Sequence, residues 1–598
     1  METIAARLNA YRQAGHSARD HLLKSRDAIA GADPHNAWIS VIDAATLGRM
    51  IDWLEQQPQS LPLYGVPFAV KDNIDVAGLP TTAGCPDYCY WPDAHAAVVE
   101  RLMRAGAIPL GKTNLDQFAP GLVGSRSPYG ACRNAFDQSR ISGGSSAGSA
   151  VAVALGQVTF ALGTDTAGSG RVPAAFNNLL GLKPTRGRLS TRGGVPACRS
   201  LDCVNVFGLC GDDVRRVFEV ADGFDPLDPQ ARPAQPPAPL QAAIPQDGFR
   251  FGVPREQDLA FFGDEQTAAA FHHGIQALEA LGGEACRIDL TPFLEAARLL
   301  YEGPWVAERY SAIREFIESR PESLLPVTRQ IIGAGAAPLA CDLFSAQHRL
   351  AELRRATEPV WEQVDCLVTP TAGYLPTIEA VKADPVGINS QLGYYTNFMN
   401  LLDLSAIAAP SGFTPDGLPF GLTLSAPAFM DRPLIDLAER LQRHRQLPLG
   451  TGRQSAAATA RVLEADHGEH RLAIAVCGAH MSGLPLNETL TERGGRHLQT
   501  TRTAALYRLY ALPGGPPARP GLVRVDADGE AVEVEVWTLP RHRVGDFLDT
   551  IPAPLGLGRI TLEDGREVIG FVCEAAATGS AEDISALGSW RRYLTRSG

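Results

Sequence analysis

The sequence lacks long apolar runs and clusters of basic residues. No stretch reaches the roughly eighteen consecutive apolar residues of a membrane-spanning helix, so we predict no membrane partner. The formal net charge is −12 and no run of Lys and Arg occurs, which argues against binding to nucleic-acid phosphates. The N-terminal stretch METIAARLNAYRQAGHSARD lacks the build of a signal peptide and is typical of an amphipathic helix. These absences favour a cytoplasmic protein.

Cysteine motifs and phosphate-binding motifs are missing as well. The eleven cysteines, an odd number, contain no CxxC pair. Cys198, Cys203 and Cys210 lie near one another in the sequence, but no histidine accompanies them at metal-ligand spacing. Reduced thiols are the simplest interpretation. Because no GxxxxGK[ST] loop occurs either, we predict no metal and no cofactor.

The length of 598 residues favours more than one domain. Strands alternate with helices to about residue 182 and again from about residue 250, which predicts a mixed α/β sheet covered by helices. The stretch 225–247 is rich in Pro, Ala and Gln and is interpreted as a loop within that domain. A second stretch, over 447–460, consists mainly of small and polar residues, and short strands and turns are predicted after it. We predict a first domain over 1–446, a linker over 447–460 and a smaller, β-rich α+β domain over 461–598.

Several local elements matter for the site. Residues up to about 60, including Val41, show helical spacing. An apolar strand is predicted over 66–70, directly before Lys71. A long helical region over 291–320 opens with a Thr-Pro pair suited to a cap and first turn, and it breaks near Gly303-Pro304. Around the stretch 141–171 we predict a buried helix over 147–155, a strand over 158–162 and a helix over 172–180.

The stretch 141–171, ISGGSSAGSAVAVALGQVTFALGTDTAGSGR, contains two loops rich in small residues, GGSSAGS and GTDTAGS. The first loop precedes the predicted helix, where free N–H groups and the helix dipole favour negative charge. Each loop offers serine hydroxyls beside backbone donors. A serine nucleophile and an oxyanion hole need this combination.

GGSSAGSA followed by GTDTAGSGRVPAAF resembles the signature of the amidase signature family, serine hydrolases with a Ser–cis-Ser–Lys triad. Upstream, GVPFAVKDNIDVAGLPTTAG matches the lysine motif of that family, and the resemblance covers roughly residues 60–440. One departure is Ala167-Gly168-Ser169-Gly170, where members often have Gly-Gly-Ser followed by Ile or Val; it leaves the substrate open. The resemblance implies an amidase signature fold, with Ser169 as nucleophile, Ser145 as bridging cis-serine, Lys71 as base, and the N–H groups of Thr166, Ala167 and Gly168 as oxyanion hole.

A lysine acts as a base only when it is neutral, so its pKa must be lowered by burial or by positive charge nearby. The apolar strand before Lys71 fits a desolvated amine. Ser142, Ser146 and Ser149 are alternatives in the first loop, and we expect them to form supporting hydrogen bonds or to cap the next helix. Asp165 is expected to orient the second loop.

A further stretch, YEGPWVAER over 301–309, resembles the segment with which allophanate hydrolases hold the substrate carboxylate. Arg309 offers a bidentate fork and Tyr301 a hydroxyl. The two residues lie about two helical turns apart and so could share a face. Gly121 and Gly124, in GLVGSR, are expected to form a small-residue wall suited to a compact substrate.

The C-terminal runs AVCGAHMSGLPLN, YRLYALPGGPPARPGLVRV and IGFVCEAAA resemble the extra domain of allophanate hydrolases, and the later part resembles the γ-glutamyl-cyclotransferase-like fold. The resemblance implies decarboxylation of N-carboxycarbamate in this domain. His480 is the candidate residue, since a histidine can bind a carboxylate or move a proton near neutral pH.

Together the resemblances imply a homodimeric enzyme that converts allophanate to ammonia and N-carboxycarbamate in urea or s-triazine-type nitrogen catabolism. Three alternatives stay open. The chain could be a general amidase for malonamate-like or aryl amides, or one component of a transamidosome-type assembly acting on aminoacylated RNA. The C-terminal domain could also be an oligomerisation module without chemistry.

Overall fold

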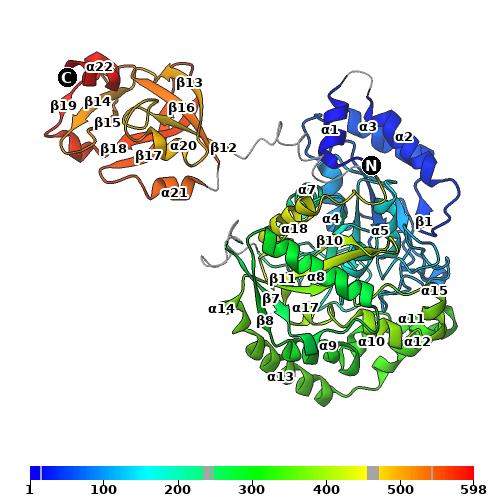
Figure 1. Cartoon of the computed structure of the whole chain (residues 1–598). Helices are drawn as coiled ribbons and strands as arrows, with labels where there is room; N and C mark the ends of the chain where they lie inside the picture. The colour runs from blue at the N-terminus through cyan, green and yellow to red at the C-terminus, as the bar shows by residue number, and fades with distance from the viewer. Residues whose placement is uncertain (14–15, 234–243, 245–247, 454–470, 541–542, 598) are drawn as a thin grey trace. The chain divides into compact units, whose positions relative to one another are not determined.

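The computed structural model of the chain describes residues 1–13, 16–233, 244, 248–453, 471–540 and 543–597. The chain divides into two compact units, Met1–Leu463 and Glu464–Gly598 (Figure 1). We call them the N-terminal and the C-terminal unit and describe each by itself. The domain boundary expected at residues 460 and 461, and most of the loop expected over 225–247 after residue 233, lie outside the described residues.

One mixed sheet of eleven strands forms the centre of the N-terminal unit, in the order β1-β3-β2-β4-β6-β5-β10-β11-β9-β7-β8. β2 runs parallel to both β3 and β4, and all of its residues are buried, as expected for a central parallel strand. The predicted α/β class is confirmed. The strands are β1 (Trp38–Val41), β2 (Pro67–Lys71), β3 (Ile108–Thr113), β4 (Phe160–Asp165), β5 (Leu180–Lys183), β6 (Cys203–Gly208), β7 (Arg250–Pro254), β8 (Glu284–Ile288), β9 (Cys366–Pro370), β10 (Leu404–Phe413) and β11 (Pro419–Pro427).

Helices cover this sheet. α8 and α18 lie across β10 and β11 (Figure 1), whereas the small α5 is buried along its whole length beside β2 and β4. The helices are α1 (Ile4–Tyr11), α2 (Ala18–Ile29), α3 (Ala44–Glu55), α4 (Ala97–Arg104), α5 (Ala147–Ala154), α6 (Val172–Phe176), α7 (Gly211–Ala221), α8 (Glu265–Ala280), α9 (Thr291–Glu302), α10 (Trp305–Ala312), α11 (Arg314–Ser319), α12 (Pro326–Gly333), α13 (Ala340–Thr357), α14 (Val360–Gln363), α15 (Ile378–Ala383), α16 (Gly387–Leu392), α17 (Phe398–Leu401) and α18 (Asp431–Arg445).

Three local predictions were wrong. Val41 lies in β1 rather than on a helix, because α3 begins only after Asp43, whose side chain accepts the N–H of Thr46 as an N-cap. Thr291 is the first helical residue of α9 and does not cap it. The helix expected over 172–180 ends at Phe176, since the chain turns there into β5.

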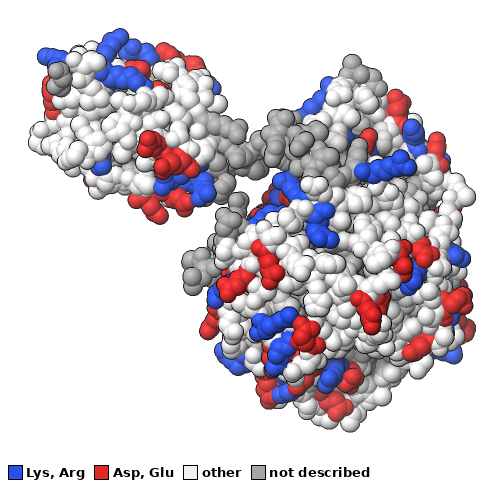
Figure 2. All heavy atoms as spheres, viewed as in Figure 1, with Lys and Arg blue, Asp and Glu red and all other residues white. Residues whose placement is uncertain are grey.

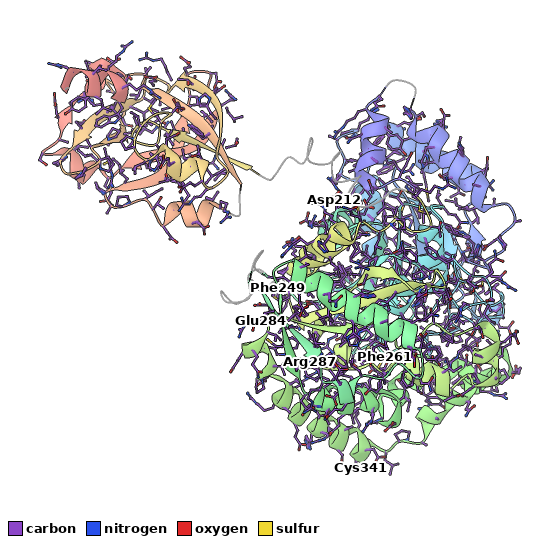
Figure 3. The ribbon with its side chains drawn as sticks, in the orientation of Figure 1. Asp212, Phe249, Phe261, Glu284, Arg287 and Cys341 are labelled. Atoms are coloured by element: carbon purple, nitrogen blue, oxygen red, sulfur yellow. The ribbon has the colours of Figure 1, made fainter. Side chains whose placement is uncertain are left out.

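β10 has a sequence that argues against a long strand, because Pro410 and Gly412 interrupt LSAIAAPSGF. The pairing register with β11 shifts between these two residues. This irregularity accommodates Pro410, which has no N–H to donate to the neighbouring strand. At the other end of the sheet, the edge strand β8 carries the exposed, charged side chains Glu284 and Arg287 (Figure 3). Charged side chains on an edge strand discourage pairing with other chains.

The C-terminal unit is β-rich, as predicted, and has its own core around Tyr507, Trp537, Phe571 and Trp590. A five-stranded sheet has the order β13-β16-β12-β18-β17, and a three-stranded sheet the order β15-β14-β19. The likeness to the γ-glutamyl-cyclotransferase-like fold stays a prediction. The elements are β12 (Arg471–Val476), α20 (Asn487–Thr491), β13 (Arg496–Arg502), β14 (Tyr507–Leu512), β15 (Arg519–Arg524), β16 (Glu533–Pro540), α21 (Val544–Leu548), β17 (Leu555–Thr561), β18 (Glu567–Cys573), β19 (Glu582–Asp583) and α22 (Trp590–Ser597).

The structure also shows how charged side chains and cysteines are placed. On the face that Figure 2 shows, acidic and basic side chains are interspersed over both units. All eleven cysteines are free thiols. Within the described residues, no group of His, Cys, Asp and Glu side chains is arranged to hold a metal ion. No helix in the described part of the chain is long and apolar enough to cross a membrane.

Candidate active site

Lys71 ends β2 and is fully buried. Its Nζ donates hydrogen bonds of 2.8 Å to Ser145 Oγ and of 2.8 Å to Thr164 Oγ1. The peptide between Gly144 and Ser145 is cis. Burial lowers the pKa of Lys71 to about 7, although nearby carboxylates, led by Asp116, act in the opposite direction. The amine is therefore available in its neutral form near neutral pH, bonded to a serine hydroxyl.

Ser146 and Ser149 bond to β4, whereas Ser142 bonds within the first loop. Ser146 Oγ donates to the carbonyl of Thr164 at 3.0 Å and accepts from the N–H of the same residue at 3.2 Å. Ser149 Oγ donates to the carbonyl of Leu162 at 2.9 Å, and Ser142 Oγ to that of Gly143 at 3.0 Å. Ser146 directly precedes α5 but makes no capping bond to it. These serines thus form supporting hydrogen bonds, and Ser146 does not take the alternative role of capping α5.

The second loop places Ser169 in an almost closed position, with 3% of its surface exposed. The backbone N–H groups of Thr166, Ala167 and Gly168 donate no hydrogen bond to any residue that the structure describes. A Cβ atom on Gly168 would lie 2.4 Å from Thr396 Oγ1, so only glycine fits there. The loop thus combines a serine with open backbone donors. No hydrogen bond joins the hydroxyls of Ser169 and Ser145 within the described residues.

An internal ion pair shapes the second loop. Arg171 donates to Asp165 through Nε and Nη2, both at 2.9 Å, and both side chains are fully buried. The N–H of Gly170 adds a third bond to the same carboxylate, at 3.0 Å. A bidentate pair of this kind has a defined geometry. Asp165 therefore orients the loop on either side of Ser169, as the sequence analysis expected.

Two acidic residues that the sequence analysis missed connect the second loop to α10. Asp202 accepts the hydroxyl proton of Thr166 and the backbone N–H of Cys198. Glu308, on α10, accepts the backbone N–H of Ser200 at 2.7 Å and its hydroxyl at 2.6 Å. The segment 197–202 thereby ties the loop with the open N–H groups to the helix that carries Arg309. No sequence motif marks these contacts, because each acidic residue joins its segment to a partner far away in the chain, Asp202 to the hydroxyl of Thr166 and Glu308 to Ser200.

Arg309 is 2% exposed, and its Cζ lies 5.3 Å from the ring centre of Tyr301. Its Nη1 donates to the carbonyl of Ala119 at 3.3 Å. Nε and Nη2 are buried and have no partner within the described residues, which is unusual for buried donors. Tyr301 and Arg309 belong to α9 and α10, so they meet across the break at Gly303 and Pro304 rather than along one helix.

Gly121 and Gly124 pack tightly against other parts of the site. A Cβ atom on Gly121 would lie 2.8 Å from Asp116 Oδ2 and 2.9 Å from Arg126 Nη1. A Cβ atom on Gly124 would lie 2.5 Å from the carbonyl oxygen of Gly143, in the first loop. Internal packing is thus sufficient to require glycine at both positions. Contact of these residues with a substrate stays a prediction.

A cavity of about 280 Å³ adjoins this site. Thr164, which accepts a hydrogen bond from Lys71, lines it together with Asp202, Val195, Arg192 and Arg199. Ser169 is not among its lining residues. Lys71 is not among them either, so the cavity reaches the hydrogen-bond partner of the base, whereas Lys71 and Ser169 are both covered by protein.

His480 lies in the C-terminal unit, in the loop after β12. Its ring stacks on that of Phe571 at 4.8 Å between centres and meets the ring of Phe547 edge-on at 5.4 Å. Burial and the neighbouring Arg519 lower the pKa of His480 to about 4. The imidazole is therefore neutral at neutral pH. The apolar rings disfavour the charged form of the imidazole, and the role of His480 in binding a carboxylate or moving a proton stays a prediction.

Comparison with known proteins decides the family. Residues 21–435 match the family model described as Amidase. The chain belongs to the amidase family. It is a hydrolase that acts on amides. Residues 472–595 of this amidase match a second model, described as the allophanate hydrolase C-terminal domain.

Individual relatives of this amidase agree with that assignment. The urea amidolyase of Saccharomyces cerevisiae is 43% identical over 97% of this chain, but the match spans only 32% of the length of that relative. The urea amidolyase of Lachancea kluyveri is likewise 43% identical, over 96% of this chain and 32% of its own length. The structure of Kluyveromyces lactis allophanate hydrolase is 40% identical, with a TM-score of 0.77, and the match covers 100% of this chain and 99% of that one. The two-unit fold of this chain is thus that of an allophanate hydrolase structure.

Proposed function

We propose that this chain is an allophanate hydrolase of urea or s-triazine-type nitrogen catabolism. The observation that carries the proposal is the buried Arg309, whose unpaired donors belong to the same site as the Lys71–Ser145 pair. The positive charge of Arg309 contributes to lowering the pKa of Lys71, so the two groups interact. A site that combines an amide-cleaving base with an unpaired guanidinium suits an amide that carries a carboxylate. Allophanate is such a compound.

The reaction begins with proton transfer to the neutral amine of Lys71. Lys71 accepts a proton from Ser145, which deprotonates Ser169, and Ser169 Oγ attacks the terminal amide carbonyl. The open N–H groups of Thr166, Ala167 and Gly168 stabilise the oxyanion. The C–N bond then breaks, and the proton passes to the leaving ammonia. Water hydrolyses the acyl-enzyme, so allophanate and water yield ammonia and N-carboxycarbamate.

The substrate carboxylate binds to Arg309. Two guanidinium nitrogens without partners provide a bidentate fork, and charge-assisted bonds of this kind are about twice as strong as neutral ones. Tyr301 lies against the same guanidinium and adds a hydroxyl. In this arrangement the carboxylate directs the distal amide towards Ser169.

The C-terminal unit removes carbon dioxide from N-carboxycarbamate. One C–N bond breaks with its electron pair left on nitrogen, which takes up a proton, so carbon dioxide and carbamate form. His480 is the proposed residue for this step. The match of residues 472–595 to the allophanate hydrolase C-terminal domain supports the assignment.

The proposed assembly rests on the resemblance, and the proposed location on the features of the sequence described above. We propose a cytoplasmic homodimer that acts on a small molecule without cofactor, nucleic-acid or membrane partner. Light scattering during size-exclusion chromatography tests the assembly, and a mass of one chain, 63.8 kDa, would contradict the dimer.

Replacing Ser169 by alanine tests the chemistry. We expect Ser169→Ala to abolish ammonia release from allophanate, because no other hydroxyl replaces the nucleophile, and to leave the circular dichroism spectrum unchanged. Ser390→Ala is the matched control, since this exposed serine bonds only to its own helix, at the carbonyl of Val386. Near-normal turnover by Ser169→Ala would falsify the assignment of the nucleophile.

Replacing Arg309 by alanine tests the substrate. We expect KM for allophanate to rise at least about tenfold, since loss of a charge-assisted pair costs about 1.5–3 kcal/mol. Benzamide, which has no carboxylate, should be turned over no better than before by Arg309→Ala. Equal loss with both amides, or faster turnover of benzamide than of allophanate by the unaltered chain, would favour the general amidase instead.

A further inference from the structure

The C-terminal unit contains two adjoining cavities that share one arginine. The larger, of about 380 Å³, is lined by Leu512, Pro517 and Ser580 among others. The smaller, of about 20 Å³, is lined by His480 and Phe571 among others. Arg519 and Leu555 line both. Arg519 therefore lies where an open space meets the narrow pocket of His480.

No acidic side chain among the lining residues neutralises the positive charge of Arg519. Arg519 has a buried Nε without a partner in the described part of the chain. None of the residues lining either cavity is an Asp or a Glu. Burying a guanidinium donor without an acceptor costs free energy unless a ligand supplies one. An anion would satisfy both the unpaired nitrogen and the unbalanced charge.

The loop that carries His480 is held in place from two sides. The N–H and hydroxyl of Ser482 both donate to Glu535 Oε2, at 2.7 and 2.9 Å. A Cβ atom on Gly478 would lie 2.4 Å from Cδ of Pro520, so the loop packs closely on β15 beside Arg519. A pocket whose walls are fixed in this way before binding is suited to a small, rigid ligand.

We propose that Arg519 binds one carboxylate of a small dicarboxylate in this pocket, beside the imidazole of His480. This inference rests on the proposed function, in which N-carboxycarbamate is the dicarboxylate. The guanidinium offers parallel donors to a carboxylate, and the neutral imidazole offers one further N–H donor. The substrate carries two negative charges, and Arg519 compensates one of them. Without Arg519, no Lys or Arg side chain would line either cavity.

Malonate is the test ligand, because it is a stable dicarboxylate with a CH₂ group in place of the NH group of N-carboxycarbamate. The full chain is labelled with ¹⁵N-histidine, and the ring signal of His480 is assigned by its loss in His480→Phe. We expect malonate to shift this signal and Arg519→Gln to weaken malonate binding at least about tenfold, which corresponds to about 1.4 kcal/mol. Arg519→Lys, which keeps the charge without the fork, should bind with intermediate affinity. Arg524→Gln, an exposed arginine on the same strand, is the matched control.

Several outcomes would overturn the proposal. They are a His480 signal that does not respond to malonate in the unaltered chain, equal malonate affinity in Arg519→Gln, and a response to inorganic phosphate as strong as that to malonate. If Arg519→Gln unfolds, the comparison of Arg519→Lys with Arg524→Gln decides, and equal affinities there would refute the role of the fork. Should the unaltered chain release no ammonia from allophanate, the proposed function fails, yet the malonate titration still decides the role of Arg519.

Discussion

Burial of a single amine governs the chemistry at the residue scale. Lys71 ends a strand whose residues are all buried, so its charged form loses hydration that two hydroxyl partners do not fully replace. The resulting pKa of about 7 keeps a large fraction of the amine neutral near neutral pH. The apolar residues before Lys71 already predict this desolvation. The residues that oppose it, Asp116 and Asp202, come from distant parts of the chain.

The pH dependence of kcat follows from this pKa. Below about pH 7 Lys71 becomes protonated and can no longer accept a proton from Ser145, so kcat for ammonia release should fall as pH decreases, approaching tenfold per unit. Thr164→Val should move the midpoint to lower pH, because Thr164 Oγ1 accepts from Lys71 and so favours its charged form. The measurement is kcat against pH for both proteins. A midpoint that does not move would assign the titration to another group.

At the scale of elements, the site depends on contacts between α10 and the loops after β4. Glu308 on α10 holds Ser200, and Asp202 at the end of the same segment holds Thr166. The helix that carries the proposed carboxylate ligand is thus joined to the loop with the open N–H groups. A change in one is expected to alter the geometry of the other.

Glu308→Ala tests this connection. It leaves the N–H and hydroxyl of Ser200 without their acceptor, so we expect the free energy of unfolding to fall by about 1–3 kcal/mol. We also expect a lower kcat with allophanate, because the loop with the open N–H groups loses its support. Glu302→Ala, at the exposed end of α9, should stay within about 0.5 kcal/mol of the unaltered chain. Urea denaturation and steady-state kinetics measure both effects, and unchanged values for Glu308→Ala would contradict the connection.

At the scale of the whole molecule, the chain consists of two units with separate hydrophobic cores. All residues proposed for amide cleavage belong to the N-terminal unit, whereas His480 and Arg519 belong to the C-terminal unit. Units with their own cores can fold independently. The residues proposed for amide cleavage and those proposed for decarboxylation are therefore held in place by two different hydrophobic cores.

Deletion of residues 464–598 tests this separation. We expect the shortened chain to fold cooperatively and to release ammonia from allophanate at a similar initial rate, while carbon dioxide forms more slowly. Coupled assays of ammonia and carbon dioxide measure the two steps. Loss of ammonia release would show that the N-terminal unit depends on the C-terminal one. Unchanged formation of both products, with only the assembly altered, would leave the C-terminal unit as an oligomerisation module.

Much of the candidate site could be predicted from short segments of sequence. The strand that ends at Lys71 and the two serine-bearing loops are local patterns, so their positions and the α/β class followed from apolar runs and small residues. β10 was not predicted, because Pro410 and Gly412 are typical of a turn. In the structure, the pairing of β10 with β11 accommodates both residues through a shift in register. Tertiary contact also decided between the two roles left open for Ser146, since its hydroxyl bonds to β4 and does not cap α5.

The sequence by itself determined the candidates for the chemistry, because Lys71, Ser145 and Ser169 lie in short motifs that resemble those of the amidase signature family. Only the tertiary structure decided their environment. Three features depend on segments that pack through long-range contacts. Arg309 meets Tyr301 across a helix break, and Asp202 and Glu308 connect separate segments. Arg519 lies beside His480 for the same reason. The buried donors of Arg309 and Arg519 that lack partners within the described residues arise from such packing, and no local pattern encodes them.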